Sequence, residues 1–230
     1  LLALAVSPMY AGFASAGRGV PTWSNREILM QLFYAPGACS LSPHIVLNEA
    51  GLSYTRVKVD TKTKAMEGGD YKSVNPLGYV PALRLDDGTI LTEGPAIVQY
   101  IADQVPDKRL APPNGTLQRT QLQSWLNFIS SELHKGFSPL FNPAMPEAAK
   151  QHFRERLATR FQHLDRHLAD QEYLLGPAFS VADAYLFTVS NWAAHTGVDL
   201  SSFGNVLAYR KRVAARPAVQ AAMRAEGLIK

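Results

Sequence analysis

The order in which strand-like and helix-like patterns follow one another most constrains how this chain can fold. Residues 31–34 are typical of a short strand, and residues 41–50 are typical of a helix that closes at Gly51. Residues 54–60 alternate in the manner of a second strand. The first third of the chain therefore predicts a βαβ unit.

A hairpin and another helix are predicted next. Val80-Pro81 leads into a strand pattern that turns at Asp87-Gly88 into a second strand, and this dipeptide is typical of tight hairpin turns. Pro95 then opens a helical pattern that ends before Pro106. The complete order is βαβ followed by ββα.

Every later pattern is helical, including a long one over residues 147–169. We expect an α/β domain at 30–107, a Pro- and Gly-containing linker at 108–116 and an all-helical domain at 117–230.

Residues 1–29 differ in composition from the rest, and we expect them to be an extension outside the fold. Two interpretations are open. Met30 is the true start of the protein, or Ala14-Ser15-Ala16 marks the cleavage site of an export signal, although no basic residue precedes its apolar stretch. The first interpretation predicts a cytoplasmic protein and the second a periplasmic one.

Composition limits the class of function. The net charge of +4 comes from scattered basic residues without a run, so we expect no nucleic-acid partner. No apolar run reaches the roughly 20 residues of a membrane span, so we expect no membrane partner. A single cysteine excludes an internal disulfide framework and a zinc cluster, and we expect no metal.

That cysteine, Cys39, lies between the first predicted strand and the first predicted helix. Free N–H groups and the positive end of a helix dipole lower a thiol pKa, so we expect a thiolate. A small buried hydrophobe is the alternative. Because Ser42 stands where a Cys-x-x-Cys motif has its second sulfur, any disulfide must form with an external thiol, of which glutathione is the most abundant.

Two further segments fit a peptide-like ligand. If the bond before Pro81 is cis, the backbone of Val80 can pair with an extended peptide; an ordinary proline at a strand start is the alternative. Glu93 and Gly94 open a helix whose N–H groups can hold a carboxylate while the Glu93 side chain takes an amino group. An acidic residue that only stabilises the helix start is the alternative.

The helical domain contributes a polar stripe on one predicted helix face. Its members are Asn127, Ser131, His134 and Ser138. A solvated surface is the alternative, but His134 and Lys135 together offer a proton donor and a cation to a sulfur held by the first domain. Ser180 and Asp183 have the spacing of a capping box, and we expect them to be structural.

Five motifs, in order, resemble those of the bacterial beta-class glutathione transferases. They are YAPGACSLSPH at 34–44, NPLGYVPAL at 75–83, LTEG at 91–94, SELHKG at 131–136 and ADAYLF at 182–187. The resemblance covers residues 30–230. It implies an α/β thioredoxin-like N-terminal domain followed by an all-α C-terminal domain, a homodimer, and glutathione bound in the cleft between the domains.

The resemblance also implies roles for individual residues. Cys39 contacts the glutathione sulfur, with which it can form a mixed disulfide, and His134 is aimed at the same sulfur. Val80, before a cis Pro81, pairs with the cysteinyl backbone, while Glu93 and Gly94 hold the γ-glutamyl head. Further implied contacts are Lys64, Asn127, Ser131, Glu132 and Leu133. Lys62 is the alternative to Lys64, because residues 61–64 read Thr-Lys-Thr-Lys.

Three functions compete. A glutathione transferase of detoxification would direct the glutathione thiolate, its co-substrate, at electrophilic small molecules. Thiol exchange or peroxidase chemistry through Cys39 is a second activity of the same site. A non-catalytic carrier of apolar ligands is the alternative, with aromatic side chains of the helical domain such as Phe137, Phe141, Tyr185 and Trp192.

Overall fold

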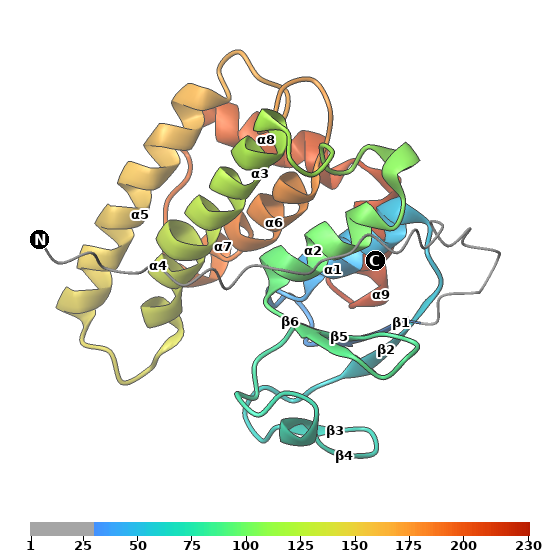
Figure 1. Ribbon diagram of the computed structural model, residues 1–230. Helices are drawn as coiled ribbons and strands as arrows, with labels where there is room; N and C mark the ends of the chain where they lie inside the picture. Colours follow the sequence, from blue (N-terminus) through green and yellow to red (C-terminus); the bar gives the residue numbers. More distant parts are fainter. Residues whose placement is uncertain (1–29) are drawn as a thin grey trace, which may run out of the picture.

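The computed structural model describes residues 30–230, so the extension predicted at 1–29 and its cleavage motif lie outside the described residues. A four-stranded sheet lies at one end of the molecule (Figure 1). Its strands are β1 (Met30–Tyr34), β2 (Tyr54–Lys58), β5 (Ala82–Arg84) and β6 (Ile90–Thr92), in the order β2–β1–β5–β6. β1 is parallel to β2, whereas β5 is antiparallel to both of its neighbours.

Two helices cover one face of this sheet (Figure 1). They are α1 (Leu41–Ala50), which connects β1 to β2, and α2 (Gly94–Asp103), which follows β6. Gly51 ends α1 in the left-handed conformation, at φ +69°, as expected for a glycine C-cap. The predicted βαβ unit, the hairpin and the final helix are thus confirmed.

A small excursion between β2 and β5 was not predicted. It contains the two-residue strands β3 (Ala65–Met66) and β4 (Gly69–Asp70) and the 3₁₀ turn η1 (Tyr71–Ser73). Strands this short show no alternation, so the sequence gives no sign of them. Tyr71 is fully buried and packs against Phe33 of β1, which attaches the excursion to the sheet.

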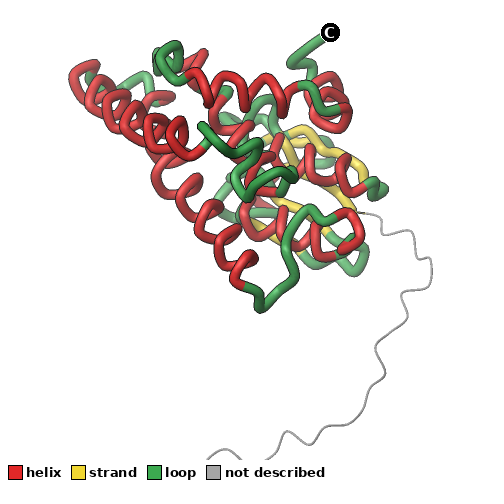
Figure 2. The backbone as a smooth tube through the Cα atoms, turned by 90° about the horizontal axis from the view of Figure 1, so that it is seen from above, coloured by secondary structure: helices red, strands yellow, loops and turns green. Residues whose placement is uncertain are grey.

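Helices make up the rest of the chain, as predicted. They are η2 (Pro106–Lys108), α3 (Leu117–Phe128), the π-helical η3 (Ile129–His134), α4 (Lys135–Phe137), η4 (Ser138–Phe141), α5 (Glu147–His167), α6 (Val181–Ser190), α7 (Ala193–Thr196), α8 (Gly204–Ala214) and α9 (Pro217–Ala225). Seen from above, the strands gather at one side of the molecule and the other side is helical (Figure 2). The predicted fold class, an α/β thioredoxin-like domain followed by an all-α domain, is confirmed.

The two domains share one hydrophobic core. All ten residues of α6 are buried, and α6 lies against both α1 and α2. Helix α9 also packs along α1. Each face of α1 is therefore covered, by the sheet and α2 within its own domain and by α6 and α9 of the helical domain.

The start of α6 has the expected capping box. The Asp183 carboxylate accepts hydrogen bonds from the backbone N–H and the hydroxyl of Ser180, both at 2.8 Å, and from the Leu174 N–H at 2.9 Å. The hydroxyl of buried Tyr209 adds a further donor at 3.1 Å. These donors satisfy a fully buried carboxylate, which is otherwise costly to remove from water.

The segment between the domains is fixed at several points. Leu110 is buried, and its carbonyl accepts a hydrogen bond from Val181 at 2.9 Å. Arg119 of α3 is 4% exposed and donates to both Asp103 carboxylate oxygens, at 2.8 and 2.7 Å. The residue limits predicted for linker and domains stay predictions, but these contacts hold the domains together.

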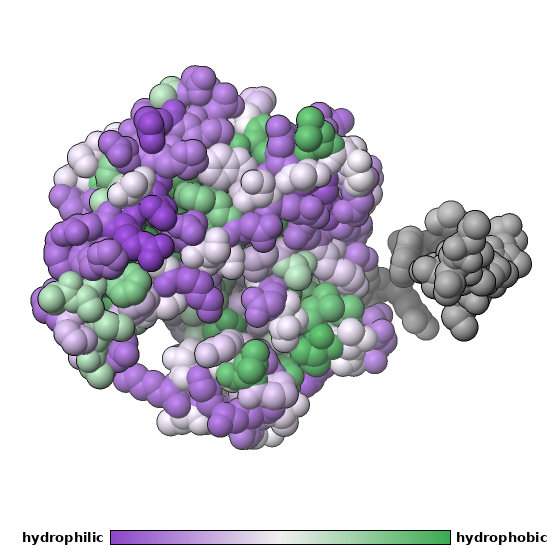
Figure 3. Space-filling view, turned by 60° about the vertical axis from the view of Figure 1, so that its left-hand side comes forward, coloured by the Kyte–Doolittle hydropathy of each residue, from purple (hydrophilic) through white to green (hydrophobic). Residues whose placement is uncertain are grey.

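Figure 3 shows a face covered largely by hydrophilic residues, with separate hydrophobic patches and a hollow low in the view. Within residues 30–230, no helix has the length and apolar character required to cross a membrane.

Candidate active site

Cys39 lies in the loop that joins β1 to α1 and faces the start of β5. Its thiol donates a hydrogen bond to the carbonyl oxygen of Val80 at 3.1 Å. The peptide bond between Val80 and Pro81 is cis, as the resemblance implied. This contact joins two of the predicted site segments, which lie 41 residues apart in the sequence.

The expectation that Cys39 is a thiolate is wrong. Burial raises the pKa of the Cys39 thiol to about 12, and the charge of Glu93 acts in the same direction. The backbone N–H groups of Cys39 and Ser40 and the charge of Lys135 lower the pKa, as the sequence suggested, but they do not outweigh the loss of solvation. Cys39 is therefore a neutral thiol and acts as a hydrogen-bond donor.

Glu93 and Gly94 form the start of α2 beside Pro81. Glu93 has φ +65°, a left-handed conformation that is uncommon for a residue with a side chain and that concentrates at functional sites. Its side chain is exposed, and its charge acts on the Cys39 thiol. A Cβ atom at Gly94 would lie 3.8 Å from Pro81 Cγ, so the helix start and the Val80–Pro81 segment are in contact.

His134 enters the site from the helical domain through an irregular helix. The single regular helix predicted here is wrong, because residues Ile129–His134 form a π-helical turn between α3 and α4. Such turns are rare and frequently occur at functional sites. His134 Nδ1 lies 2.6 Å from the Tyr185 hydroxyl, and its ring meets the Trp192 ring edge-on with centroids 4.9 Å apart.

The hydrogen bond between His134 and Tyr185 joins two groups that are both neutral near pH 7. Burial and the charge of Lys135 lower the pKa of His134 to about 4, so the ring is neutral near pH 7. Burial raises the pKa of Tyr185, which therefore keeps its proton. This contact fits either tautomer of neutral His134: Nδ1 accepts from the Tyr185 hydroxyl when the ring proton is on Nε2, and donates to it when the proton is on Nδ1.

Trp192 connects this group to the cysteine loop. Its indole Nε1–H donates to the carbonyl of Gly37 at 2.8 Å, two residues before Cys39. The charge that Cys39 carries when deprotonated, and the charge of Glu93, also raise the pKa of Tyr185. The cysteine loop, the start of α2 and the His134–Tyr185 pair are thus brought together.

Three other predicted residues have contacts within the helical domain. The Glu132 carboxylate is paired with Arg160 at 2.7 Å, and Leu133 is fully buried. The Ser131 hydroxyl donates to the Asn127 carbonyl at 2.9 Å.

Lys64 lies in the excursion between β2 and β5, and its side chain packs on Gly78, where an added Cβ would meet Lys64 Cε at 3.1 Å. The excursion therefore reaches the loop that leads to Val80.

Sequence reasoning missed three residues around the site. Tyr185 and Trp192 were interpreted only as core or pocket aromatics. A helical pattern does not show that the Tyr185 hydroxyl and the Trp192 indole N–H form hydrogen bonds with other segments. Glu226 accepts a hydrogen bond from the Gly37 N–H at 2.9 Å across 189 residues of sequence. No local signal in the sequence indicates that contact.

Fold and site together define a thioredoxin-like protein whose helical second domain adds a histidine and a tyrosine to the cysteine loop. Comparisons with known proteins extend this definition. Residues 37–104 match the family model for the glutathione S-transferase N-terminal domain, and residues 128–217 match the model for the C-terminal domain.

Individual relatives agree. The chain is 50% identical over 200 residues to glutathione S-transferase GstA of Escherichia coli O157:H7, covering 86% of this chain and 100% of that protein. It resembles the solved bacterial beta class glutathione S-transferase of Sphingomonas chungbukensis at 51% identity and a TM-score of 0.84. The match covers 86% of this chain and 100% of that protein. A sphingomonad glutathione S-transferase solved in complex with glutathione is similar at 48% identity and a TM-score of 0.84. This match also covers 86% of this chain and 100% of that protein.

The chain belongs to the glutathione S-transferase family, and within it to the bacterial beta class. The predicted family and the predicted enzyme class, a transferase that conjugates glutathione, are confirmed. The alternative of a non-catalytic carrier is not favoured.

Proposed function

We propose that the chain binds glutathione beside Cys39 and that groups from both domains stabilise its thiolate for attack on an electrophilic small molecule. One observation carries this proposal: the neutral Cys39 thiol and the donor-bearing His134–Tyr185 pair belong to one site at the domain boundary. Two positioned donors around a sulfur favour its anionic form.

The groups of the first domain suit the peptide part of glutathione. We assign the γ-glutamyl head to Glu93 and Gly94 at the start of α2, and the cysteinyl backbone to Val80 beside Pro81. The contact of Lys64 with Gly78 supports Lys64 rather than Lys62 as the cationic contact. The sphingomonad relative, which was solved with glutathione, supports the choice of ligand.

Fewer residues of the helical domain are available for polar contacts with glutathione than the resemblance implied. The Glu132 carboxylate is held by Arg160, and the Leu133 side chain is in the core. We therefore assign the polar contacts to Asn127, Ser131 and His134, whose residues are exposed or partly exposed.

The chemical step follows from the protonation states. The glutathione thiol releases its proton to water, and the resulting thiolate accepts hydrogen bonds from His134 Nε2–H and from the Cys39 thiol, whose single hydrogen turns from the Val80 carbonyl to the bound sulfur. We assign the His134 proton to Nε2 and make Tyr185 a positioning residue, because a hydrogen bond donated by its hydroxyl to Nδ1 would keep the proton there. The thiolate then attacks the electrophilic carbon, a carbon–sulfur bond forms, and the leaving group departs with its electron pair.

Thiol exchange through Cys39 is the second proposed activity, and the sequence permits it because the lone cysteine can form a mixed disulfide only with an external thiol. A thiol whose pKa is raised to about 12 provides little attacking thiolate at neutral pH. We therefore propose that conjugation dominates and that exchange is slow.

We also propose that the protein is a homodimer and acts in detoxification in the cytoplasm. The family resemblance supports the dimer, and sedimentation equilibrium should give twice the mass of the chain. A monomer mass with full conjugation activity would contradict the dimer.

Retention on immobilised glutathione, followed by conjugation to 1-chloro-2,4-dinitrobenzene, tests the proposed function. We expect the wild type to be retained and active, His134→Ala to lose about tenfold to a hundredfold in kcat, and Cys39→Ala to keep part of its activity. Thr159→Ala, on the exposed side of α5, is the matched control and should behave as wild type. No retention and no turnover by folded wild-type protein would refute the proposal.

Cys39→Ser separates the two chemistries. The variant should conjugate at a reduced rate and lose thiol exchange completely, because the exchanging sulfur is absent. Full exchange activity in this variant would exclude Cys39 as the redox group.

A further inference from the structure

The loop that carries Cys39 is held by residues from the far end of the sequence. Gly37 lies in this loop, defined as residues 35–40, with φ +71°. Its N–H donates to Glu226 Oε2 at 2.9 Å, and its carbonyl accepts from Trp192 Nε1 at 2.8 Å. Both polar backbone atoms of Gly37 are therefore bound by the helical domain.

Glu226 directly follows α9 and bridges this loop to α1. Its second oxygen, Oε1, accepts a hydrogen bond from His44 Nδ1 at 2.7 Å. The side chains of Glu226 and His44 are both fully buried. A carboxylate removed from water requires donors, and here one comes from the loop and the other from α1.

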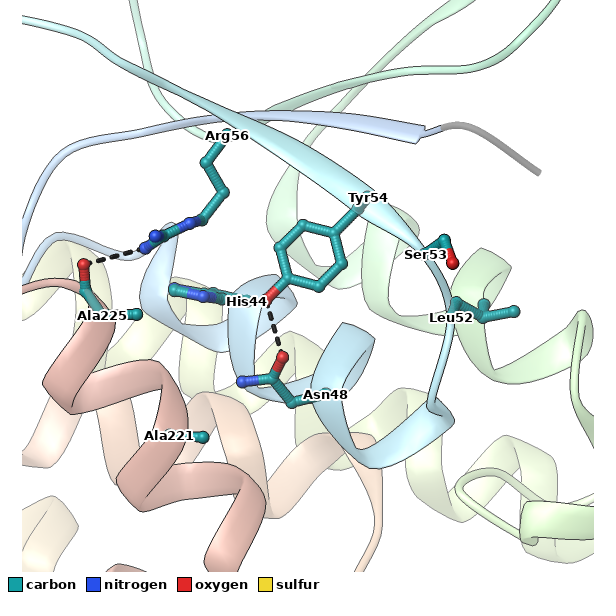
Figure 4. Close-up of a pocket in the computed structure, with 8 residues that line it drawn as sticks. All are labelled: His44, Asn48, Leu52, Ser53, Tyr54, Arg56, Ala221 and Ala225. Atoms are coloured by element: carbon teal, nitrogen blue, oxygen red, sulfur yellow. Dashed lines mark hydrogen bonds between the residues drawn. The ribbon is translucent and has the colours of Figure 1, made fainter. Parts of the chain in front are cut away.

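The surroundings fix the position of Glu226. Figure 4 shows Arg56 of β2 reaching the carbonyl of Ala225, at 2.9 Å, and Tyr54 donating to Asn48 of α1, at 2.6 Å. Asn48 in turn donates to the carbonyl of Ala218 in α9 at 3.2 Å. The end of α9 is thus attached to β2 and α1 on the same side as His44.

We propose that Glu226 is a positioning residue for Cys39: its two hydrogen bonds fix the loop at residues 35–40, so that the Cys39 sulfur lies at the Val80 carbonyl where glutathione is bound. The effect on catalysis rests on the proposed function, whereas the effect on the loop does not. The Glu226 side chain bonds to the Gly37 N–H and to His44. It therefore acts on the sulfur through these two groups and not by direct contact.

Two substitutions separate geometry from charge. Glu226→Gln keeps the shape, but an amide has one accepting and one donating end, so it cannot accept from both Gly37 N–H and His44 Nδ1–H. Glu226→Asp keeps the negative charge, but its side chain is one methylene shorter and cannot span both donors. A change that appears in both variants is due to the lost bridge and not to the lost charge.

Glu49→Gln is the matched control. Glu49 of α1 accepts two hydrogen bonds from Arg216, at 2.6 and 2.9 Å, and so ties α1 to the residue that precedes α9. This pair joins the same two helices but does not contact the loop at residues 35–40. Its loss should reduce thermal stability without changing the loop.

The readout is alkylation of Cys39 by iodoacetamide without glutathione, since the sequence contains one cysteine. We expect Glu226→Gln and Glu226→Asp to speed alkylation by about tenfold, because a loosened loop exposes the thiol. Their kcat for conjugation should fall by about tenfold, since displacing a catalytic group by about 1 Å can lower the rate by up to about a hundredfold. Glu49→Gln should match the wild type in both measurements.

Equal alkylation and conjugation rates in the Glu226 variants and Glu49→Gln would overturn the inference. If the wild type fails to conjugate while the Glu226 variants still speed alkylation, the proposed function fails and the role of Glu226 in the loop stands. Should Glu226→Gln not fold, the Glu226→Asp variant decides by the same two rates.

Discussion

The hydroxyl of Tyr185 provides the sharpest test of how the site handles protons. Tyr185→Phe removes one oxygen atom from a buried ring and leaves the packing of α6 otherwise unchanged. The lost interaction is the hydrogen bond of 2.6 Å to His134 Nδ1. Without this donor, the His134 proton can occupy Nδ1, and Nε2 then has no hydrogen to give to the glutathione sulfur.

The structure sets the size of the effect. Leaving a buried acceptor such as His134 Nδ1 without its partner costs about 1–3 kcal/mol. If that loss appears in the transition state, kcat falls by about 5- to 150-fold, since each 1.36 kcal/mol is a factor of ten. The KM for glutathione should change by less than about twofold, because Glu93, Gly94 and Val80 are untouched.

A double-mutant cycle with His134→Ala is the assay. Because Tyr185 acts through His134, Tyr185→Phe should cost little more in a protein that already lacks the imidazole. Nitrogen-15 NMR of His134 should show the proton on Nε2 in the wild type and a mixture of tautomers in Tyr185→Phe. Equal losses in kcat with and without His134, or an unchanged tautomer, would refute the reasoning.

Two further predictions concern neighbouring parts of the site. A Cβ atom at Gly136 would lie 2.9 Å from Leu157 Cδ2, and Leu157 is fully buried. Gly136→Ala should therefore lower the unfolding free energy in urea by about 1 kcal/mol in spite of its better helix propensity; a more stable variant would contradict the packing. Because burial raises the pKa of Cys39 from 9.0 to about 12, the thiolate fraction of Cys39 at pH 8 should be about a thousandfold lower than that of an ordinary thiol, so its alkylation should be slower and should rise tenfold per pH unit. A plateau at pH 9 would contradict the raised pKa.

Patterns with a clear period were predictable from the sequence. The helix at 41–50 and the hairpin around Gly88 follow from side-chain periodicity and turn residues, and the structure has both. The π-helical turn at Ile129–His134 was not predictable, because it is a change of backbone hydrogen bonding within a segment whose side chains still read as helix. The two-residue strands β3 and β4 are too short to show any alternation.

The sequence indicated candidate residues that the structure brings together, but it did not indicate their protonation. The sequence indicated Cys39, Val80, Glu93 and His134. It predicted a thiolate at Cys39 because only the local N–H groups and helix dipole are visible from the sequence. The desolvation that raises the pKa of the thiol comes from tertiary packing. The contact of Glu226 with Gly37 also depends on how the helical domain closes over α1.

The two hydrogen bonds from the helical domain to Gly37 affect how domains of related proteins can be combined. A chimera that takes residues 30–107 from one protein and the remainder from another inherits the cysteine from the first parent. The partners of Gly37, Trp192 and Glu226, come from the second parent. The reactivity of the Cys39 thiol therefore depends on both parents, and exchanging the helical domain should change the reactivity of a cysteine that lies in the other domain.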